Sequence, residues 1–497
     1  MLFNSYAFIF FFFPIVLLGF FLIGKKHARA AAGFLVLASL FFYGWWSIKA
    51  LPLLVGSILF NYWAGLRLTP GPDRGDAGRK RMLIFALAVD LGVLAIFKYA
   101  DFFISNVNSG LAAGDFNALP LLRVALPIGI SFYTFTQIAF LVDCWQGKVR
   151  ERNFVHYALF VTYFPHLVAG PVLHHAQMMP QFADRATYRI DPDKVALGLA
   201  IFVFGLAKKL LIGDPMGGYA DLVFAGVHHG TMPALATSWL GVLAYTLQIY
   251  FDFSGYSDMA VGMSLCLGVR LPLNFNSPYK STSIIEFWRR WHISLSTFLR
   301  DYLYVPLGGN RKGPRRRYVN LFITMLLGGL WHGAEWTYVI WGGLHGTYLA
   351  INHVWNDRVH SSASPGRVGR MAGWMLTFLC VMIAWVVFRA DNIHDAMDVY
   401  KGMLGLHGSH AAAFSEYASV PYHQREFFQK MVAGLLICVA LPPTITLQRW
   451  VPQVQSLVAR PRAAMFSTAM MALLTVVLLG FSVSRLGSYS PFIYFQF

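Results

Sequence analysis

Long apolar runs, separated by short polar or basic loops, recur along this sequence. A helix needs about 20 apolar residues to cross a bilayer, and about eleven segments approach this length. Apolar pieces such as Val155–Ala169 are interpreted as too brief to span and could dip into the bilayer and return. The pattern predicts an all-α polytopic membrane protein. The predicted segments are Leu2–Ile23, Phe34–Asn61, Met82–Ile104, Val124–Cys144, Val195–Ile212, Ser238–Leu267, Tyr318–Leu330, Trp336–His353, Met371–Phe388, Met431–Thr446 and Ala464–Phe481.

The first apolar segment, Leu2–Ile23, resembles a secretory signal only in its hydrophobicity. Its positive charges follow the apolar run instead of preceding it, and it lacks a small-residue cleavage site. We therefore expect a retained first span.

Basic residues concentrate in the loops, which is typical of cytoplasmic loops in membrane proteins. These loops cannot all be cytoplasmic if every apolar segment crosses the bilayer. Phe34–Asn61, which contains Gly44 and Pro52, lies between two of them, and we predict two half-length helices that enter and leave on one side. The basic loops are Lys25–Arg29, Arg67–Arg81, Lys148–Arg152, Lys280–Arg317, Arg358–Arg370 and Arg449–Arg462.

Tyr318–His353 poses the same conflict, and we predict a second re-entrant pair there. Gly328, Gly329 and Gly333 lie near the expected turning point. Broken backbone at membrane depth is tolerated only where protein or a water-filled cavity surrounds it. A cavity is therefore expected near this turn.

Composition agrees with a membrane protein, since 57% of the 497 residues are hydrophobic and only 13% are charged. The net charge of +17 could indicate nucleic-acid binding, but the charges lie in loops beside apolar runs, so no nucleic-acid partner is expected. The four cysteines are isolated and predict neither a disulfide nor a metal site. We predict one transmembrane domain, residues 1–497, with an external loop near Asp391–Gln429 and an interfacial tail after Arg485.

His332 lies between apolar and glycine-rich residues at predicted membrane depth, where an ionisable side chain is a candidate functional site. Trp331 and Trp336 could exclude water around it. A neutral imidazole can accept a proton from a hydroxyl group, as acyl transfer from a thioester to an alcohol requires. The residues alone favour this role no more than a hydrogen bond that pins two helices. His345 could orient His332 or only pack the helix pair.

Glu286–Leu307 predicts an amphipathic helix along the cytoplasmic interface, with its aromatic face inward. His292 falls at the edge of the apolar face, and its spacing slightly favours a structural core histidine over a catalytic one. Arg300 and Asp301 are candidates for supporting or lining a tunnel, although a solvated or lipid-facing charge run is the favoured interpretation of the arginines.

Two acids, Asp252 and Asp258, lie in an otherwise apolar stretch and need partners. Ser254 and Tyr256 are near in sequence, and Gly255 offers a helix break. We favour a polar knot that caps broken backbone, with the lining of a donor channel as the alternative.

Five stretches together resemble the membrane-bound O-acyltransferase (MBOAT) superfamily, most of all the branch with the membrane subunit of alginate O-acetylation. They occur in the family's order over most of the chain. They are Tyr163–His175, Tyr250–Gly262, Asn274–Arg311, Leu326–Gly346 and the terminal sequence FIYFQF.

The resemblance implies a fold of tilted and re-entrant helices around a central tunnel, with a catalytic core near residues 155–355. It implies that His332 is catalytic and His292 a second important position. No bound cofactor is implied. An acetyl group from a cytoplasmic donor, acetyl-CoA, would pass to a periplasmic or membrane-anchored acetyltransferase partner that modifies an exported polysaccharide such as alginate or cellulose. The implied location is the bacterial inner membrane, as a multi-pass protein.

Three alternatives stay open at this point. A D-alanyl or peptidoglycan acyl relay would use the same chemistry on another acceptor. A sugar or precursor transporter would use the histidines as a proton relay. A scaffold would only hold an export complex together.

Overall fold

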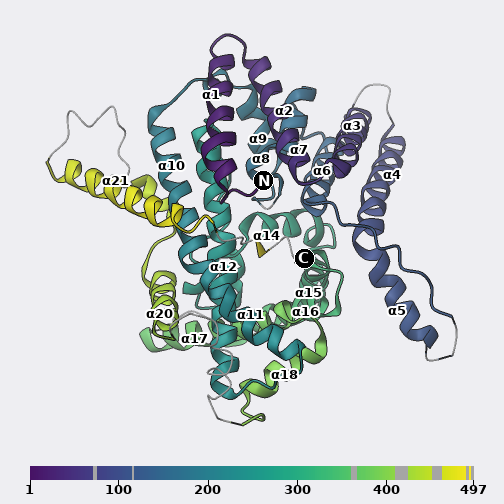
Figure 1. Cartoon of the computed structure of the whole chain (residues 1–497). Coiled ribbons are helices and arrows are strands. Elements are labelled where there is room, and N and C mark those ends of the chain that lie inside the picture. Colours follow the sequence, from purple (N-terminus) through teal and green to yellow (C-terminus); the bar gives the residue numbers. More distant parts are fainter. Residues whose placement is uncertain are drawn as a thin grey trace. The chain divides into compact units, whose positions relative to one another are not determined.

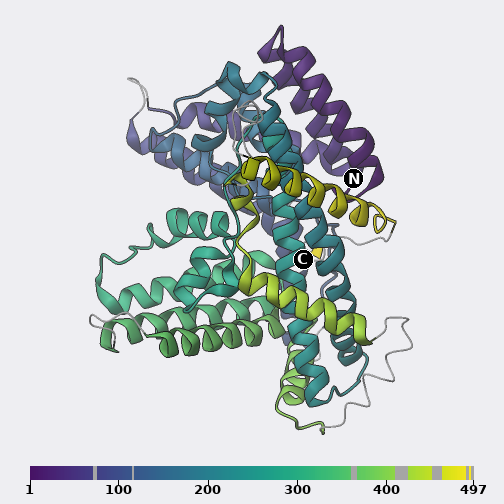
Figure 2. The same cartoon turned by 90° about the vertical axis from the view of Figure 1, so that its left-hand side faces the viewer.

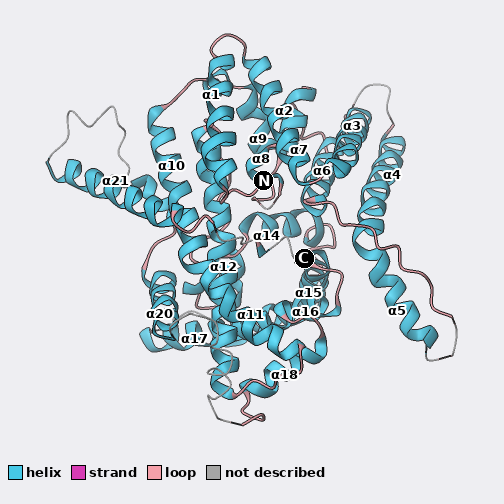
Figure 3. Ribbon diagram, viewed as in Figure 1, coloured by secondary structure: helices cyan, strands magenta, loops and turns pink. Residues whose placement is uncertain are grey.

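The structure is a computed structural model that describes residues 1–70, 75–112, 114, 117–168, 170–359, 366–408, 424–449, 462–487 and 492–493. Within these ranges the regular structure is helical and contains no strand (Figure 3), which confirms the predicted fold class. Packing divides the chain into two compact units, which we describe separately. Unit 1 is Met1–Val203, Ser257–Pro272 and Leu447–Val477; unit 2 is Phe204–Tyr256, Leu273–Thr446 and Leu478–Phe497.

Aromatic contacts hold together the first helices of unit 1, whose backbone Figure 1 shows. The rings of Phe12 and Phe164 meet edge to face at 5.4 Å, and Phe8 meets Phe42 in the same way at 5.8 Å. The helices are α1 (Phe13–Gly24, after a π-helical turn at Ala7–Phe12), α2 (Ala28–Trp46), α3 (Leu51–Leu68), α4 (Asp76–Leu94), α5 (Ala100–Ala112), α6 (Ile130–Trp145), α7 (Phe154–Thr162), α8 (Phe164–Leu167), α9 (His175–Ala183) and most of α10 (Pro192–Ala207).

The predicted break within Phe34–Asn61 is present, but the two helices are not half-length. α2 ends where Ser47 adopts an extended conformation, with φ −154° and ψ 98°. Pro52 then lies in the first turn of α3, where a missing backbone N–H is tolerated. Both helices are long enough to cross a membrane. Two full crossings also return the chain to its starting side, which resolves the charge conflict.

Six helices among the described residues are long and apolar enough to cross a membrane. The other predicted segments are helical as well, but they are shorter, more polar or only partly described. The six are Ala7–Gly24, Ala28–Trp46, Ile48–Leu68, Asp76–Ala112, Pro192–His228 and Arg367–Arg389.

Unit 2 contains the predicted site residues except Asp258, which belongs to unit 1. Its helices are α11 (Asp214–His228), the first two thirds of α12 (Leu235–Cys266), α13 (Ile284–Arg290), α14 (Ile293–Leu299), α15 (Gly313–His332), α16 (Trp336–Val359), α17 (Arg367–Arg389), α18 (Ile393–Met403) and α20 (Gln424–Ala440). α21 (Arg462–Val483) is shared with unit 1.

α15 and α16 form a helical hairpin, and Figure 2 gives the side view of its two adjacent helices. The predicted turning point is confirmed at residues 333–335, which include Gly333. Gly329 is inside α15, where an added Cβ would collide with the carbonyl oxygen of Tyr338. Gly342 of α16 is equally crowded by the backbone of Met325. These glycines therefore serve close packing of two helices, a role separate from the turn.

Part of the predicted external loop is helical, because α18 begins two residues after Asp391. The Asn392 side chain caps it by accepting a hydrogen bond from the Asp395 backbone N–H at 2.9 Å. Residues 409–423 lie outside the described part of the chain. In the predicted interfacial tail, Phe492 and Ile493 are described and both are buried, so the interfacial prediction is wrong for these two residues.

Candidate active site

The predicted amphipathic helix at Glu286–Leu307 is broken at His292. α13 ends before this residue, α14 starts after it, and His292 has φ 44° and ψ 54°. This left-handed conformation costs about 1–2 kcal/mol for a residue with a Cβ, so the surrounding contacts must stabilise it. The histidine side chain is only 1% exposed. It is therefore in the core of unit 2, and not at the edge of an amphipathic face.

Asn274 fixes the orientation and the tautomer of His292. The Asn274 Oδ1 atom accepts hydrogen bonds from the backbone N–H and the hydroxyl of Ser294, at 3.3 and 2.9 Å. The same oxygen lies 3.0 Å from His292 Nδ1. Because an amide oxygen only accepts, Nδ1 carries the proton and the lone pair is on Nε2. Burial lowers the pKa of His292 to about 3, so the ring is neutral at physiological pH.

His332 is the last residue of α15 and is 6% exposed. Three aromatic rings surround its imidazole edge to face, at centroid distances of 4.9 Å for Trp331, 5.1 Å for Trp341 and 5.3 Å for Phe388. These rings shield His332 from water. Trp336, which was predicted to help, begins α16 and is 51% exposed.

Trp331 lies between the two candidate catalytic histidines. Its ring centroid is 6.4 Å from that of His292 and 4.9 Å from that of His332. The structure therefore brings the broken helix and the hairpin tip together around one indole ring. Acid–base chemistry that uses both histidines is possible in this arrangement.

His345 supports this cluster from the far side of Trp341. Its Nδ1 atom accepts a hydrogen bond of 3.2 Å from the indole N–H of Trp288, which joins α16 to α13. Trp341 packs against His345 at 4.9 Å and against His332 at 5.1 Å. The contacts of His345 are therefore those of a packing residue that also positions Trp341.

A double-mutant cycle tests the bond between His345 and Trp288. His345→Leu should leave the half-buried indole N–H without its acceptor, and Trp288→Phe should remove that donor. We expect the two changes to couple by about 1 kcal/mol in the free energy of unfolding, because the double variant leaves no donor unsatisfied. Thermal unfolding of the purified variants measures this coupling. Strictly additive losses would show that the bond contributes nothing.

Asp252 is buried, but its predicted surroundings were wrong. α12 runs through Gly255 without a break. The partners of Asp252 are Lys209, whose Nζ lies 2.5 Å from Oδ1, and the backbone N–H of Ile493, which donates to Oδ2 at 2.8 Å. Asp252 therefore connects Lys209 and Ile493, which are distant in sequence, and does not cap a helix end.

The remaining candidates lie at the surface or in the other unit. Arg300 and Asp301 follow α14 and form an exposed ion pair with each other, with Nε and Oδ1 2.7 Å apart. Asp258 is half-buried in the part of α12 that belongs to unit 1. Their roles as supporting or tunnel-lining residues stay predictions.

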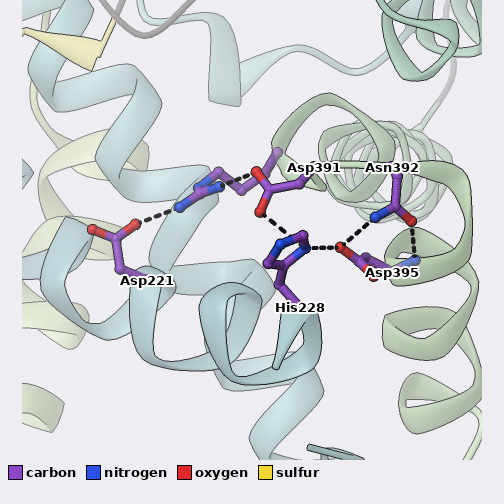
Figure 4. A network of polar contacts seen from close by, with 6 residues as sticks. Asp221, His228, Asp391, Asn392 and Asp395 are labelled. Carbon is purple, nitrogen blue, oxygen red and sulfur yellow. Dashed lines mark hydrogen bonds and ion pairs between the residues drawn. The ribbon is translucent and has the colours of Figure 1, made fainter. Parts of the chain in front are cut away.

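A second polar cluster joins the end of α11 to the junction of α17 and α18 (Figure 4). His228 Nδ1 lies 2.8 Å from an Asp395 oxygen and 3.6 Å from an Asp391 oxygen. These ligand types could hold a metal ion. However, Arg389 pairs with Asp391 at 3.7 Å and Asn392 donates to Asp395 at 2.9 Å. We therefore interpret the cluster as an ion-pair network that fastens the helices.

Sequence reasoning missed Asn274, Trp341 and Lys209. Only Lys209 carried a usable signal, since a lysine inside the apolar run Val195–Ile212 needs a buried carboxylate partner. Predicting the contact of Trp341 with His332 would have required knowing how α15 and α16 align in the hairpin. Asn274 reaches His292 from a loop that has no periodic pattern.

The chain resembles known proteins over the stretches that contain these residues. The sequence model of the MBOAT, membrane-bound O-acyltransferase family matches residues 115–389. This range includes His292, His332 and His345.

Three of the relatives show the range of stated activities. A peptidoglycan O-acetyltransferase of Helicobacter pylori is 42% identical over 446 residues, 84% of this chain and 82% of that protein. A probable alginate O-acetylase, AlgI, of Pseudomonas aeruginosa is 46% identical over 404 residues, 81% of this chain and 75% of that protein. A teichoic acid D-alanyltransferase of Bacillus subtilis is 26% identical over 278 residues, 54% of this chain and 69% of that protein.

Proposed function

We propose that this chain, which belongs to the membrane-bound O-acyltransferase (MBOAT) family, passes an acetyl group from cytoplasmic acetyl-CoA across the bacterial inner membrane. The acetyl group then serves O-acetylation of an exported polysaccharide such as alginate or cellulose. The chain is a multi-pass membrane acyltransferase. The observation that carries the proposal is the pair of buried histidines, His292 and His332, joined by Trp331. The stated activities of the two O-acetylating relatives support this class of acceptor.

His332 is the general base in this proposal. Its imidazole takes the proton of the acceptor hydroxyl as that oxygen attacks the thioester carbonyl carbon. A C–O bond forms, the C–S bond breaks, and the leaving thiolate receives the proton. The lone pair on His292 Nε2 supports proton movement from the other side of Trp331.

The aromatic shell around His332 protects the donor from hydrolysis. Trp331, Trp341 and Phe388 are 4%, 1% and 1% exposed, and all three contact the imidazole. Excluding water in this way favours transfer to a positioned hydroxyl over transfer to water.

The charge of the α15–α16 hairpin supports a cytoplasmic donor. Arg315 and Arg316 at the start of α15 and Arg358 near the end of α16 are exposed and lie at its open end. Clustered positive charge favours the cytoplasmic side and suits the phosphates of a nucleotide-bearing donor. His332 lies at the opposite end of α15. The acyl group would therefore travel from the basic end toward the tip, as a relay requires.

The acceptor side would need a partner, a periplasmic or membrane-anchored acetyltransferase. The D-alanyltransferase relative supports one alternative, in which the relayed group is D-alanyl or the acceptor is peptidoglycan. A sugar or precursor transporter is the alternative of a different class.

Turnover of the donor by the purified chain tests the proposal. We expect protein in lipid vesicles to release free CoA from acetyl-CoA when a hydroxyl acceptor or the partner is supplied. Vesicles without protein provide the background rate. A transporter would release none, and a preference for a D-alanyl thioester would favour the alternative relay.

A further inference from the structure

A buried lysine of unit 2 lies in a candidate membrane-spanning segment. Lys209 is 1% exposed and lies within the candidate span Pro192–His228. Its ammonium group pairs with Asp214 at 2.9 Å and with Asp252 at 2.5 Å. Burying such a cluster is costly, so ionisable groups inside a membrane-spanning segment are candidates for function.

The backbone around Lys209 is irregular. Residues Lys208–Gly213 form a π-helical turn between α10 and α11. Such turns inside longer helices occur frequently at functional sites, because the extra residue redirects side chains. Here the turn accompanies a lysine that is directed at Asp252.

Phe492 and Ile493, which we call the C-terminal segment, are held by the second oxygen of Asp252. This oxygen accepts the backbone N–H of Ile493 at 2.8 Å. Phe492, which is 0% exposed, stacks on Tyr256 at 4.3 Å and contacts Phe253 at 5.8 Å. Ile493 is therefore fixed in the core of unit 2 by a carboxylate that is ion-paired with Lys209.

This anchored segment reaches His292 through one ring. Phe253 meets the His292 imidazole edge to face, at 4.8 Å and 87°. The same ring contacts Phe492. A displacement of the C-terminal segment would thus remove the support beneath Phe253, which packs against the histidine.

We propose that Lys209 and Asp252 form a buried latch that holds the C-terminal segment and so positions His292 for the reaction. The inference rests on the proposed function, because His292 takes part in that reaction. Lys209 and Asp252 act through Ile493, Phe492 and Phe253, and are positioning residues.

Two matched double variants separate the latch from general stability. Lys209→Met with Asp252→Asn removes both charges but keeps a carbonyl oxygen that can accept the Ile493 N–H. Lys209→Met with Asp252→Leu removes the charges and the acceptor. We expect the first pair to retain most of the transfer rate, and the second to lower kcat by about tenfold while the KM for acetyl-CoA changes little.

Labelling measures the latch directly. Ile493→Cys is introduced into each background, and modification of residue 493 by N-ethylmaleimide is followed by mass spectrometry. We expect slow labelling in the parent and in the Asp252→Asn pair, and labelling faster by about tenfold in the Asp252→Leu pair. Equal labelling in both pairs would overturn the latch.

A variant on the tail side covers the case in which the double variants fail to fold. Ile493→Pro removes the backbone donor and leaves the ion pair intact, and Ile493→Val is its control. We expect Ile493→Pro alone to lose transfer. Unchanged transfer in Ile493→Pro, or faster labelling with unchanged transfer in the Asp252→Leu pair, would overturn the positioning of His292. Failure of the parent protein to transfer any acyl group would overturn the proposed function, while the labelling would still decide the latch.

Discussion

Replacing His332 with alanine is expected to lower the rate of acyl transfer by roughly 10²- to 10⁴-fold, the usual contribution of a general base. The imidazole is shielded by Trp331, Trp341 and Phe388. Water therefore has poor access to replace it as the proton acceptor. Polymer O-acetylation in cells and CoA release by purified protein measure the loss, with the amount of protein in the membrane as the reference.

His332→Gln distinguishes catalysis from packing. Glutamine is close in size to histidine and can hydrogen-bond, but its amide does not accept a proton at neutral pH. We expect it to be as inactive as His332→Ala. Substantial activity in His332→Gln together with loss in His332→Ala would assign His332 a packing role. Full activity in both would end the proposal that it is the base.

The pattern of apolar runs and basic loops was sufficient to predict the class of fold. The conflict between basic loops also located two real features, the break near Ser47 and the hairpin turn at residues 333–335. Its resolution differed, since α2 and α3 are both long enough to cross. Charge patterns show that the chain must return to one side of the membrane. The length of each helix, however, depends on where the backbone N–H and C=O groups at its ends find hydrogen-bond partners.

Single residues of the candidate site, such as His292 and His332, were predicted from the sequence, but the contacts between them were not. A helical period runs through Glu286–Leu307 and conceals the break at His292, because a left-handed histidine leaves no trace in hydrophobic spacing. Its stabilising partner, Asn274, comes from a loop. Sequence proximity to His332 suggests Trp336, but the packing of α15 on α16 places the indole of Trp341 against His332. These contacts are tertiary, so local sequence could not supply them.

Gly342→Ala is expected to cause the second large loss, through the packing of the hairpin that carries His332. A Cβ at this position would overlap the carbonyl oxygen of Met325 and lie 3.0 Å from the Cα of Leu326. Backbone atoms cannot move aside as a flexible side chain can, so α15 and α16 must separate. Overpacking of this kind costs about 1–3 kcal/mol, which outweighs the gain of up to about 1 kcal/mol in helix propensity.

Moving α15 and α16 apart should also displace the rings around His332, because Trp341 precedes Gly342 directly and packs on His332 at 5.1 Å. A misplacement of about 1 Å can cost about a hundredfold in rate, so activity should fall further than stability. Gly343→Ala is the matched control, since its added Cβ would have its nearest neighbours at 3.9 Å, in ordinary contact. We expect that variant to be stable and active. Equal behaviour of the two alanine variants, in thermal unfolding and in transfer rate, would show that close helix approach does not set the geometry of His332.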